Sequence, residues 1–111
     1  MNQSLPVPSL INPDASIPHK ERLGRCYELA GNLAHHNPDV FLVHGTIQGL
    51  RFPRMGHAWV ILPDGQVWEP TSNQVWKRDI FQGFFRPQVN KKYDYQAMLR
   101  ECIRHEHWGP W

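Results

Sequence analysis

Two segments of the chain repeat apolar residues at intervals of three and four, the spacing of one helix face. In residues 21–36 the apolar stripe consists of Leu23, Tyr27, Ala30 and Ala34. Pro38 ends this helix, because the residue before a proline is driven out of the helical region. In residues 95–106 the stripe consists of Met98, Leu99, Cys102 and Ile103, with Asp94 as the expected N-cap. The pattern therefore predicts one helix early in the chain and another near its end.

Between these helices the chain is rich in β-branched and aromatic residues, which favour strands. We expect strands at residues 39–47, 57–62, 66–70, 74–78 and 89–93. Residues 81–87 contain three phenylalanines together with Gly83 and Pro87, and we interpret them as an aromatic-rich loop packed on the domain. Gly31, inside the first helix, indicates close packing against another element.

The turn between the second and third strands determines which side chains share a face. Pro63 has no N–H, so it does not suit a two-residue loop in which residue 63 must donate a hydrogen bond. A three-residue loop fits better, with Pro63 at the start of a type I turn and Gly65 in the left-handed position. This register sets Trp59 opposite Glu69. His57 and Glu69 then project from the same face as diagonal neighbours.

The chain has 111 residues, which is enough for one ordinary domain. We place this domain at residues 19–111. Residues 1–18 contain four prolines and predict an extended arm before it. The apolar share of 41% is enough for a single core. Twelve basic and ten acidic residues are mixed along the chain without a basic stripe, so we do not expect nucleic-acid binding.

Two cysteines are too few for a disulfide framework. Neither a signal peptide nor an apolar run of membrane-spanning length is visible. We therefore expect a cytoplasmic protein without membrane attachment, in a compartment where thiols stay reduced.

Three side chains have the chemistry of a nucleophilic cysteine site. Cys26 lies at an expected helix start, where unpaired N–H groups and the helix dipole favour a thiolate. His57 can act as general base and then as general acid. Glu69 can hold the tautomer and orientation of that imidazole. The alternative to a catalytic role is that Cys26 and His57 are structural core residues, as we expect for Cys102.

The motifs Gly24-Arg25-Cys26, His57-Ala58-Trp59-Val60 and Glu69-Pro70-Thr71 resemble, in this order, the transglutaminase-like group of papain-fold cysteine enzymes. The resemblance covers residues 24–71, with Glu69 where the group usually has Asp. It implies an α+β fold with a papain-like core, in which the cysteine-bearing helix packs on a small antiparallel sheet beside a C-terminal helix. It also implies a Cys-His-acid site of the protease, transglutaminase, amidase or deamidase type, with no cofactor.

The function predicted from these residues is hydrolysis of, or acyl transfer from, a peptide, isopeptide or glutamine amide through a thioester on Cys26. The oxyanion formed in such a reaction needs hydrogen-bond donors. The backbone N–H of Cys26 is one candidate. A second donor could be the side chain of Asn12, His19 or Trp59.

Other functions stay open at this point. The fold could be an inactive module that binds a protein partner or a small ligand, with a contact surface formed by Phe81, Phe84, Phe85, Trp108 and Trp111. Alternatively, the scattered basic residues could bind a nucleotide or a nucleic acid. The chain has seven histidines, which could in principle bind a metal ion. Histidines that are close in sequence are one or two positions apart, and a helical metal-binding pair is four apart, so we do not expect a metal site.

Overall fold

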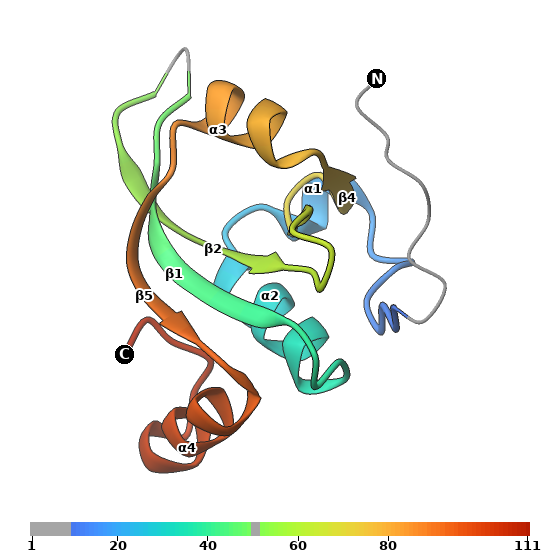
Figure 1. Cartoon of the computed structure of the whole chain (residues 1–111), viewed down its shortest axis with the longest axis vertical. Helices are drawn as coiled ribbons and strands as arrows, with labels where there is room; N and C mark the ends of the chain where they lie inside the picture. The colour runs from blue at the N-terminus through green and yellow to red at the C-terminus, as the bar shows by residue number, and fades with distance from the viewer. Residues whose placement is uncertain (1–9, 50–51) are drawn as a thin grey trace.

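In the part of the chain that the structure describes, five strands form one antiparallel sheet in the order β4-β3-β2-β1-β5 (Figure 1). The computed structural model describes residues 10–49 and 52–111. The strands are β1 (Phe41–Ile47), β2 (Met55–Ile61), β3 (Val67–Glu69), β4 (Gln74–Trp76) and β5 (Gln88–Tyr93). All five overlap the strands predicted from residue type, which confirms that part of the sequence interpretation.

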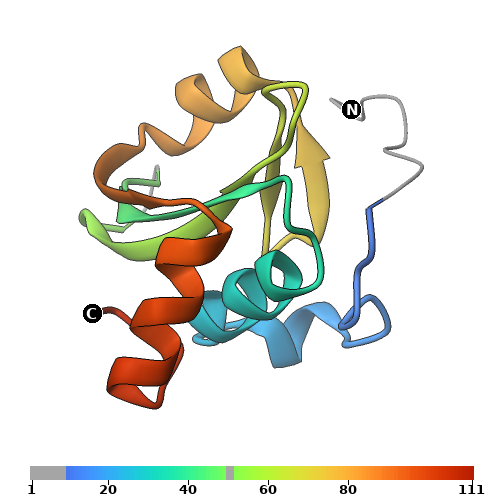
Figure 2. The same ribbon diagram turned by 60° about the horizontal axis from the view of Figure 1, so that its bottom comes forward.

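Four helices among the described residues accompany the sheet, and together they give the α+β class that the sequence predicted. They are α1 (His19–Arg22), α2 (Cys26–His35), α3 (Arg78–Phe85) and α4 (Tyr95–His105). Helices α2 and α4 lie on one face of the sheet, and α3 lies on the other (Figure 2). None of the helices within residues 10–49 and 52–111 has the length and apolarity needed to cross a membrane.

Alternating side chains of the central strands supply a core on each face. Ala58 and Val60 of β2 point to the α2 side, whereas Trp59 points to the α3 side. The larger core contains Leu29, Ala30, Leu33, Ala34, Val40, Leu42, Ala58, Val60, Leu62, Trp68, Tyr93 and Met98. The smaller core contains Val43, Ile47, Trp59, Val67 and Phe81. The sheet is thus covered on both faces, with its larger core under α2.

The early helix predicted at residues 21–36 is wrong in its first part. The chain forms the short helix α1, leaves it at Leu23, and starts α2 only at Cys26. Gly24 has a φ of +78°, a left-handed conformation that interrupts a right-handed helix. The interruption places Cys26 at the start of a new helix.

The predicted loop at residues 81–87 is also wrong, because most of it belongs to α3. Phe81, Phe84 and Phe85 have the three- and four-residue spacing of one helix face, and Phe81 is buried in the smaller core. Gly83 costs a helix only about 1 kcal/mol relative to alanine. Pro87 follows the end of the helix and does not interrupt it. The spacing of the three phenylalanines therefore indicated the helix more reliably than Gly83 and Pro87 indicated a loop.

The C-terminal tail folds back on the domain after α4, whose N-cap is Asp94 as predicted. A Cβ on Gly31 would collide with the ring of Trp108, which confirms the close packing expected there. Trp111 packs against His44 and Tyr93. Trp108 and Trp111 are thus half-buried against the domain and Phe81 is buried, whereas the partner surface suggested by the sequence stays a prediction.

The described part of the predicted arm lies against the domain. The side chain of Asn37 accepts a hydrogen bond from the Ile11 N–H and donates one to the Ile11 carbonyl oxygen. The carbonyl oxygen of Asp14 accepts a hydrogen bond from Arg22. Residues 1–9 of the arm lie outside the described residues.

Gly45 allows β1 to pass close to two neighbours, and its replacement tests this packing. A Cβ at Gly45 would collide with the carbonyl oxygen of Gln88 and lie 2.9 Å from the Trp59 ring. We expect Gly45→Ala to lower the free energy of unfolding by about 1–3 kcal/mol, as overpacking does. The matched control is Gly83→Ala, where a Cβ meets no atom of the described residues within 4 Å. This change should stabilise α3 by about 0.5–1 kcal/mol in urea unfolding.

Burial of His44 makes the free energy of unfolding depend on pH. Its ring is 5% exposed among aromatic side chains, and neither ring nitrogen has a hydrogen-bond partner among the described residues. Burial lowers the pKa of His44 from 6.5 to about 4. The unfolded chain therefore binds a proton at this residue between these pH values and the folded chain does not, so stability falls as the pH falls through this window.

We expect this residue to remove up to about 3 kcal/mol of the unfolding free energy between pH 6.5 and pH 4. Urea unfolding at about pH 7 and about pH 4.5 measures the loss. His44→Leu should reduce the difference between the two pH values, whereas replacement of the exposed His105 by leucine should leave it unchanged. Equal pH dependence in the wild type and His44→Leu would contradict this assignment.

Candidate active site

Cys26 is the first residue of α2, and the chain before it explains its position. After the left-handed turn at Gly24, Arg25 takes the N-cap position with φ −116°. Its carbonyl oxygen accepts the N–H of Leu29 at 2.9 Å, the first hydrogen bond of the helix. Within the described residues no side chain caps this end. The first-turn N–H groups at Cys26 therefore have no side-chain cap among the described residues.

The hairpin between β2 and β3 has the register predicted from Pro63. Val60 pairs with Trp68 and Ile61 with Val67, and the loop is the three-residue one. The N–H of Gly65 donates to the carbonyl oxygen of Leu62 at 2.9 Å, and Gly65 takes the left-handed position with φ +87°. The local turn therefore sets His57 and Glu69 on the same face, as the sequence predicted.

The imidazole of His57 and the carboxylate of Glu69 form a buried hydrogen bond, with Nε2 and Oε2 2.7 Å apart. The carboxylate also accepts the backbone N–H of Thr71 on Oε2 at 2.9 Å and that of Ser72 on Oε1 at 2.7 Å. Glu69 is 1% exposed and His57 5% exposed. Three donors thus satisfy a carboxylate that has almost no contact with solvent.

Cys26 reaches this pair at the end of the sheet, although α2 covers the opposite face. Gly56 makes the approach possible, because a Cβ there would lie only 2.9 Å from the Tyr27 hydroxyl oxygen. Cys26, His57 and Glu69 line one cavity of about 370 Å³. Since Nε2 of His57 bonds to Glu69, Nδ1 is the ring nitrogen left for the Cys26 thiol.

The electrostatics of the three groups favour a charged histidine. Burial lowers the pKa of His57, but the hydrogen bond to Glu69 and the interaction with the nearby Cys26 outweigh burial and raise the pKa to about 9. For Glu69, burial raises the pKa, and the hydrogen bonds from His57 and Ser72 more than reverse this effect, so the carboxyl pKa is lower than usual. At neutral pH the pair is therefore an imidazolium and a carboxylate.

Arg22 supports the site, and sequence analysis missed it. Its Nε donates to the carbonyl oxygen of Pro70 at 2.6 Å, and its Nη1 donates to that of Asp14 at 2.8 Å. The residue is 1% exposed and its guanidinium lies 5.9 Å from the Trp68 ring centre. It thereby holds the turn that follows Glu69. A single arginine in a four-residue helix carries no sequence signal for such a position.

The three proposed oxyanion donors lie in different places. His19 lines the Cys26 cavity, and its Nδ1 is 3.1 Å from the carbonyl oxygen of Thr71. Asn12 is not among the described residues that line this cavity. Its amide donates to Asn73 Oδ1 at 2.8 Å, so in this structure Asn12 braces the turn at Asn73.

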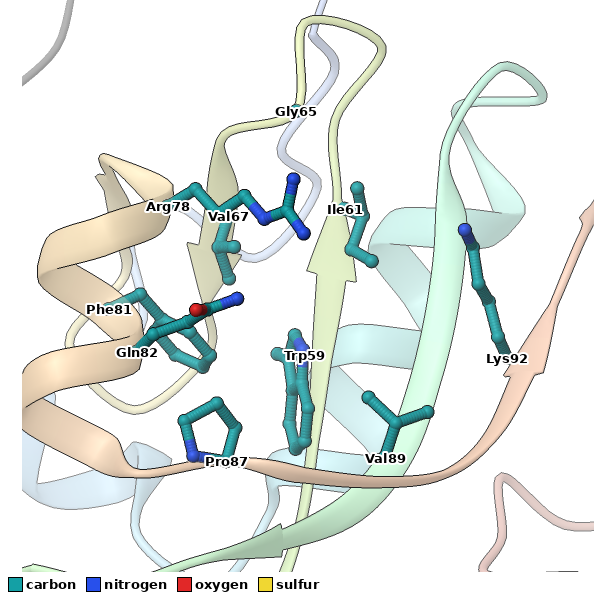
Figure 3. Close-up of a pocket in the computed structure, with 10 residues that line it drawn as sticks. All are labelled: Trp59, Ile61, Gly65, Val67, Arg78, Phe81, Gln82, Pro87, Val89 and Lys92. Atoms are coloured by element: carbon teal, nitrogen blue, oxygen red, sulfur yellow. The ribbon is translucent and has the colours of Figure 1, made fainter.

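Trp59 is likewise outside the described lining of the Cys26 cavity. It stacks on His57 with ring centres 6.2 Å apart and is 2% exposed. Its indole lines a separate cavity of about 320 Å³ beneath α3, together with Arg78, Gln82 and Val89 (Figure 3). Trp59 is thus the wall behind His57 and not a donor beside the thiol.

The remaining cysteine and histidines form no second site of this kind. Cys102 lies on α4 with its sulfur 3.9 Å from that of Met98, and burial raises the pKa of its thiol. Within residues 10–49 and 52–111, no three His, Cys, Asp or Glu side chains are grouped so that they could hold a metal ion. Cys102 also lines a hollow with Glu106 and His107, but these two side chains are exposed and no hydrogen bond between them is found among the described residues. Beside Cys26, in contrast, the histidine and the acid are buried and hydrogen-bonded to each other.

Comparison with known proteins adds no relative: no family model, no curated protein and no solved structure matches this chain. The resemblance to the transglutaminase-like group therefore remains a prediction from three short motifs. Any functional conclusion has to rest on the geometry of the site itself.

The ionisation of His57 can be measured directly. We expect its imidazole to titrate near pH 9 in nitrogen-15 NMR, because the neighbouring groups raise its pKa. Glu69→Gln should lower this midpoint toward the ordinary value of about 6.5, since the amide removes the negative charge that favours the imidazolium. Glu101→Gln is the matched control, because Glu101 bonds the exposed His105 at 3.2 Å. A wild-type midpoint near 6.5 would contradict the geometry described here.

Proposed function

We propose that this protein is a cysteine hydrolase or acyltransferase that cleaves amides through a thioester on Cys26, on a papain-like core. The observation that carries the proposal is the arrangement of Glu69, His57 and Cys26 around one cavity. The buried imidazole bonds the carboxylate of Glu69 through Nε2, and its Nδ1 is the nitrogen available for the Cys26 thiol, which lines the same cavity. The cysteine-bearing helix on an antiparallel sheet also supports the papain-like core.

The first half of the reaction follows from the charges. The thiolate form of Cys26 attacks the amide carbonyl carbon and forms a C–S bond. The carbonyl electrons move to oxygen, where the Cys26 N–H can hold the resulting oxyanion. His57 then gives its Nδ1 proton to the amide nitrogen, the C–N bond breaks, and an amine leaves. The products are a thioester on Cys26 and a neutral His57.

The second half returns the proton. Neutral His57 takes a proton from water, for hydrolysis, or from an acceptor amine, for transfer. The activated nucleophile attacks the thioester carbon, and the C–S bond breaks to release an acid or a new amide. Glu69 keeps its negative charge throughout and stabilises the imidazolium each time it forms. No redox partner or cofactor takes part in these steps.

Alkylation of the two thiols tests the proposal. We expect iodoacetamide at about pH 6 to label Cys26 at least tenfold faster than it labels glutathione, because only the thiolate reacts. Cys102 should react more slowly than glutathione, since burial raises its pKa. Mass spectrometry of tryptic peptides measures both rates in the same sample.

Variants of histidine provide the control. His57→Gln should slow the labelling of Cys26 at least tenfold, with folding verified by circular dichroism, whereas replacement of the exposed His105 by glutamine should not change it. Slow labelling of Cys26, equal to that of Cys102, would overturn the enzyme proposal. The alternative of an inactive binding module would then be favoured.

A further inference from the structure

The cavity beside Cys26 is apolar on every side except the catalytic one. Its apolar walls come from the α1–α2 turn, the β1–β2 hairpin, β4 and α3. The apolar side chains are Leu23, Ile47, Phe52, Met55, Trp76, Phe84 and Phe85. Its volume of about 370 Å³ lies at the low end of the range for small-molecule sites, roughly 300–1,000 Å³. One bulky group can therefore fill it.

Charge in the cavity is restricted to the catalytic groups. No Lys, Arg or Asp side chain is among the described residues that line it. The carboxylate of Glu69 is already bonded to His57, Thr71 and Ser72, and His19 lies at the rim. A charged group entering this space would lose its hydration without gaining an ion pair. The cavity therefore selects against a charged occupant.

The rim of the cavity exposes large apolar side chains to solvent. Leu23 is 58% exposed, Met55 50%, Phe84 55% and Phe52 40%. They come from separate parts of the chain and gather around a single opening. Contiguous exposed apolar surface of this kind marks a binding site more often than isolated surface residues do.

The wall formed by α3 is packed rather than loose. The ring of Trp76 lies 5.6 Å from that of Phe84 and 5.2 Å from that of Phe85, and Phe85 packs on the buried Phe81 at 5.0 Å. This network fixes the aromatic surface that faces the thiol. The wall is thus present before any ligand binds.

From these walls we infer that the acyl part of the substrate carries a large uncharged apolar group, which fills the cavity while its carbonyl carbon lies at Cys26. An aromatic or aliphatic side chain next to the scissile amide, or a short fatty acyl chain, has this chemistry. The inference rests on the proposed function, because it places the group relative to the attacking thiol. Phe84 of α3 and Leu23 of the α1–α2 turn, which both line the cavity and are exposed at its rim, are its specificity-determining residues.

Substituted iodoacetamides test this inference with the full chain. The probes are iodoacetamide, N-hexyl iodoacetamide, N-phenethyl iodoacetamide, and 6-(iodoacetamido)hexanoate, which ends a chain of similar length in a carboxylate. Each rate of Cys26 labelling is divided by the rate of the same reagent with glutathione. We expect at least one apolar reagent to label Cys26 at least tenfold faster than iodoacetamide, and the carboxylate reagent to show no such gain. Hexyl and phenethyl rates distinguish an aliphatic from an aromatic occupant.

Two cavity variants and one control variant connect the preference to the cavity. Phe84→Ser and Leu23→Ser should each reduce the apolar preference at least threefold, where the preference is the ratio of the apolar-reagent rate to the plain iodoacetamide rate measured in the same variant. Ile80→Ser is the matched control, since Ile80 is 43% exposed on the same helix but outside the cavity lining. Cys102 should show no preference in any variant.

The outcomes separate the two proposals. Fast labelling by iodoacetamide with no apolar preference, or a preference that survives both serine variants, overturns this inference and leaves the proposed function standing. Labelling of Cys26 by iodoacetamide no faster than that of glutathione overturns the proposed function, and this inference with it.

Discussion

A buried carboxylate organises the site and much of the chain around it. A charge with 1% exposure costs several kcal/mol unless it is paired and hydrogen-bonded, and Glu69 has both kinds of partner. The imidazolium of His57 balances its charge, and the N–H groups of Thr71 and Ser72 complete its hydrogen bonds. These donors are available only because the chain turns sharply at Pro70. Arg22 then secures that turn to α1.

The site combines groups from two faces of one sheet. Helix α2 packs on one face and delivers Cys26 at its first turn, whereas His57 and Glu69 project from the other face. They meet at the end of β2, where Gly56 has no side chain to keep the helix away. Helix α3 covers the second face and brings its phenylalanines to the same cavity. The polar catalytic groups and the apolar walls therefore have separate structural origins.

Local chemistry was a good guide where a single residue type decided the outcome. The missing N–H of Pro63 specified the loop length, and the loop length specified the register that joins His57 to Glu69. Glycine positions predicted local structure less well, because the effect of a glycine depends on the residues packed around it. Gly24 interrupts a helix, Gly31 admits a tryptophan ring, and Gly83 is tolerated within a helix. Because Gly83 is typical of a loop, the sequence did not predict α3.

The sequence by itself determined the strands, the hairpin register and the three candidate catalytic residues. These depend on side-chain alternation and turn chemistry, which act over a few residues. Only the tertiary structure decided which other side chains reach the thiol. It brought Phe84 to the opening, buried Arg22 beneath the turn, and moved Asn12 and Trp59 away from the oxyanion. Such contacts join segments far apart in the chain, so they depend on how helices and sheet pack and not on any local pattern.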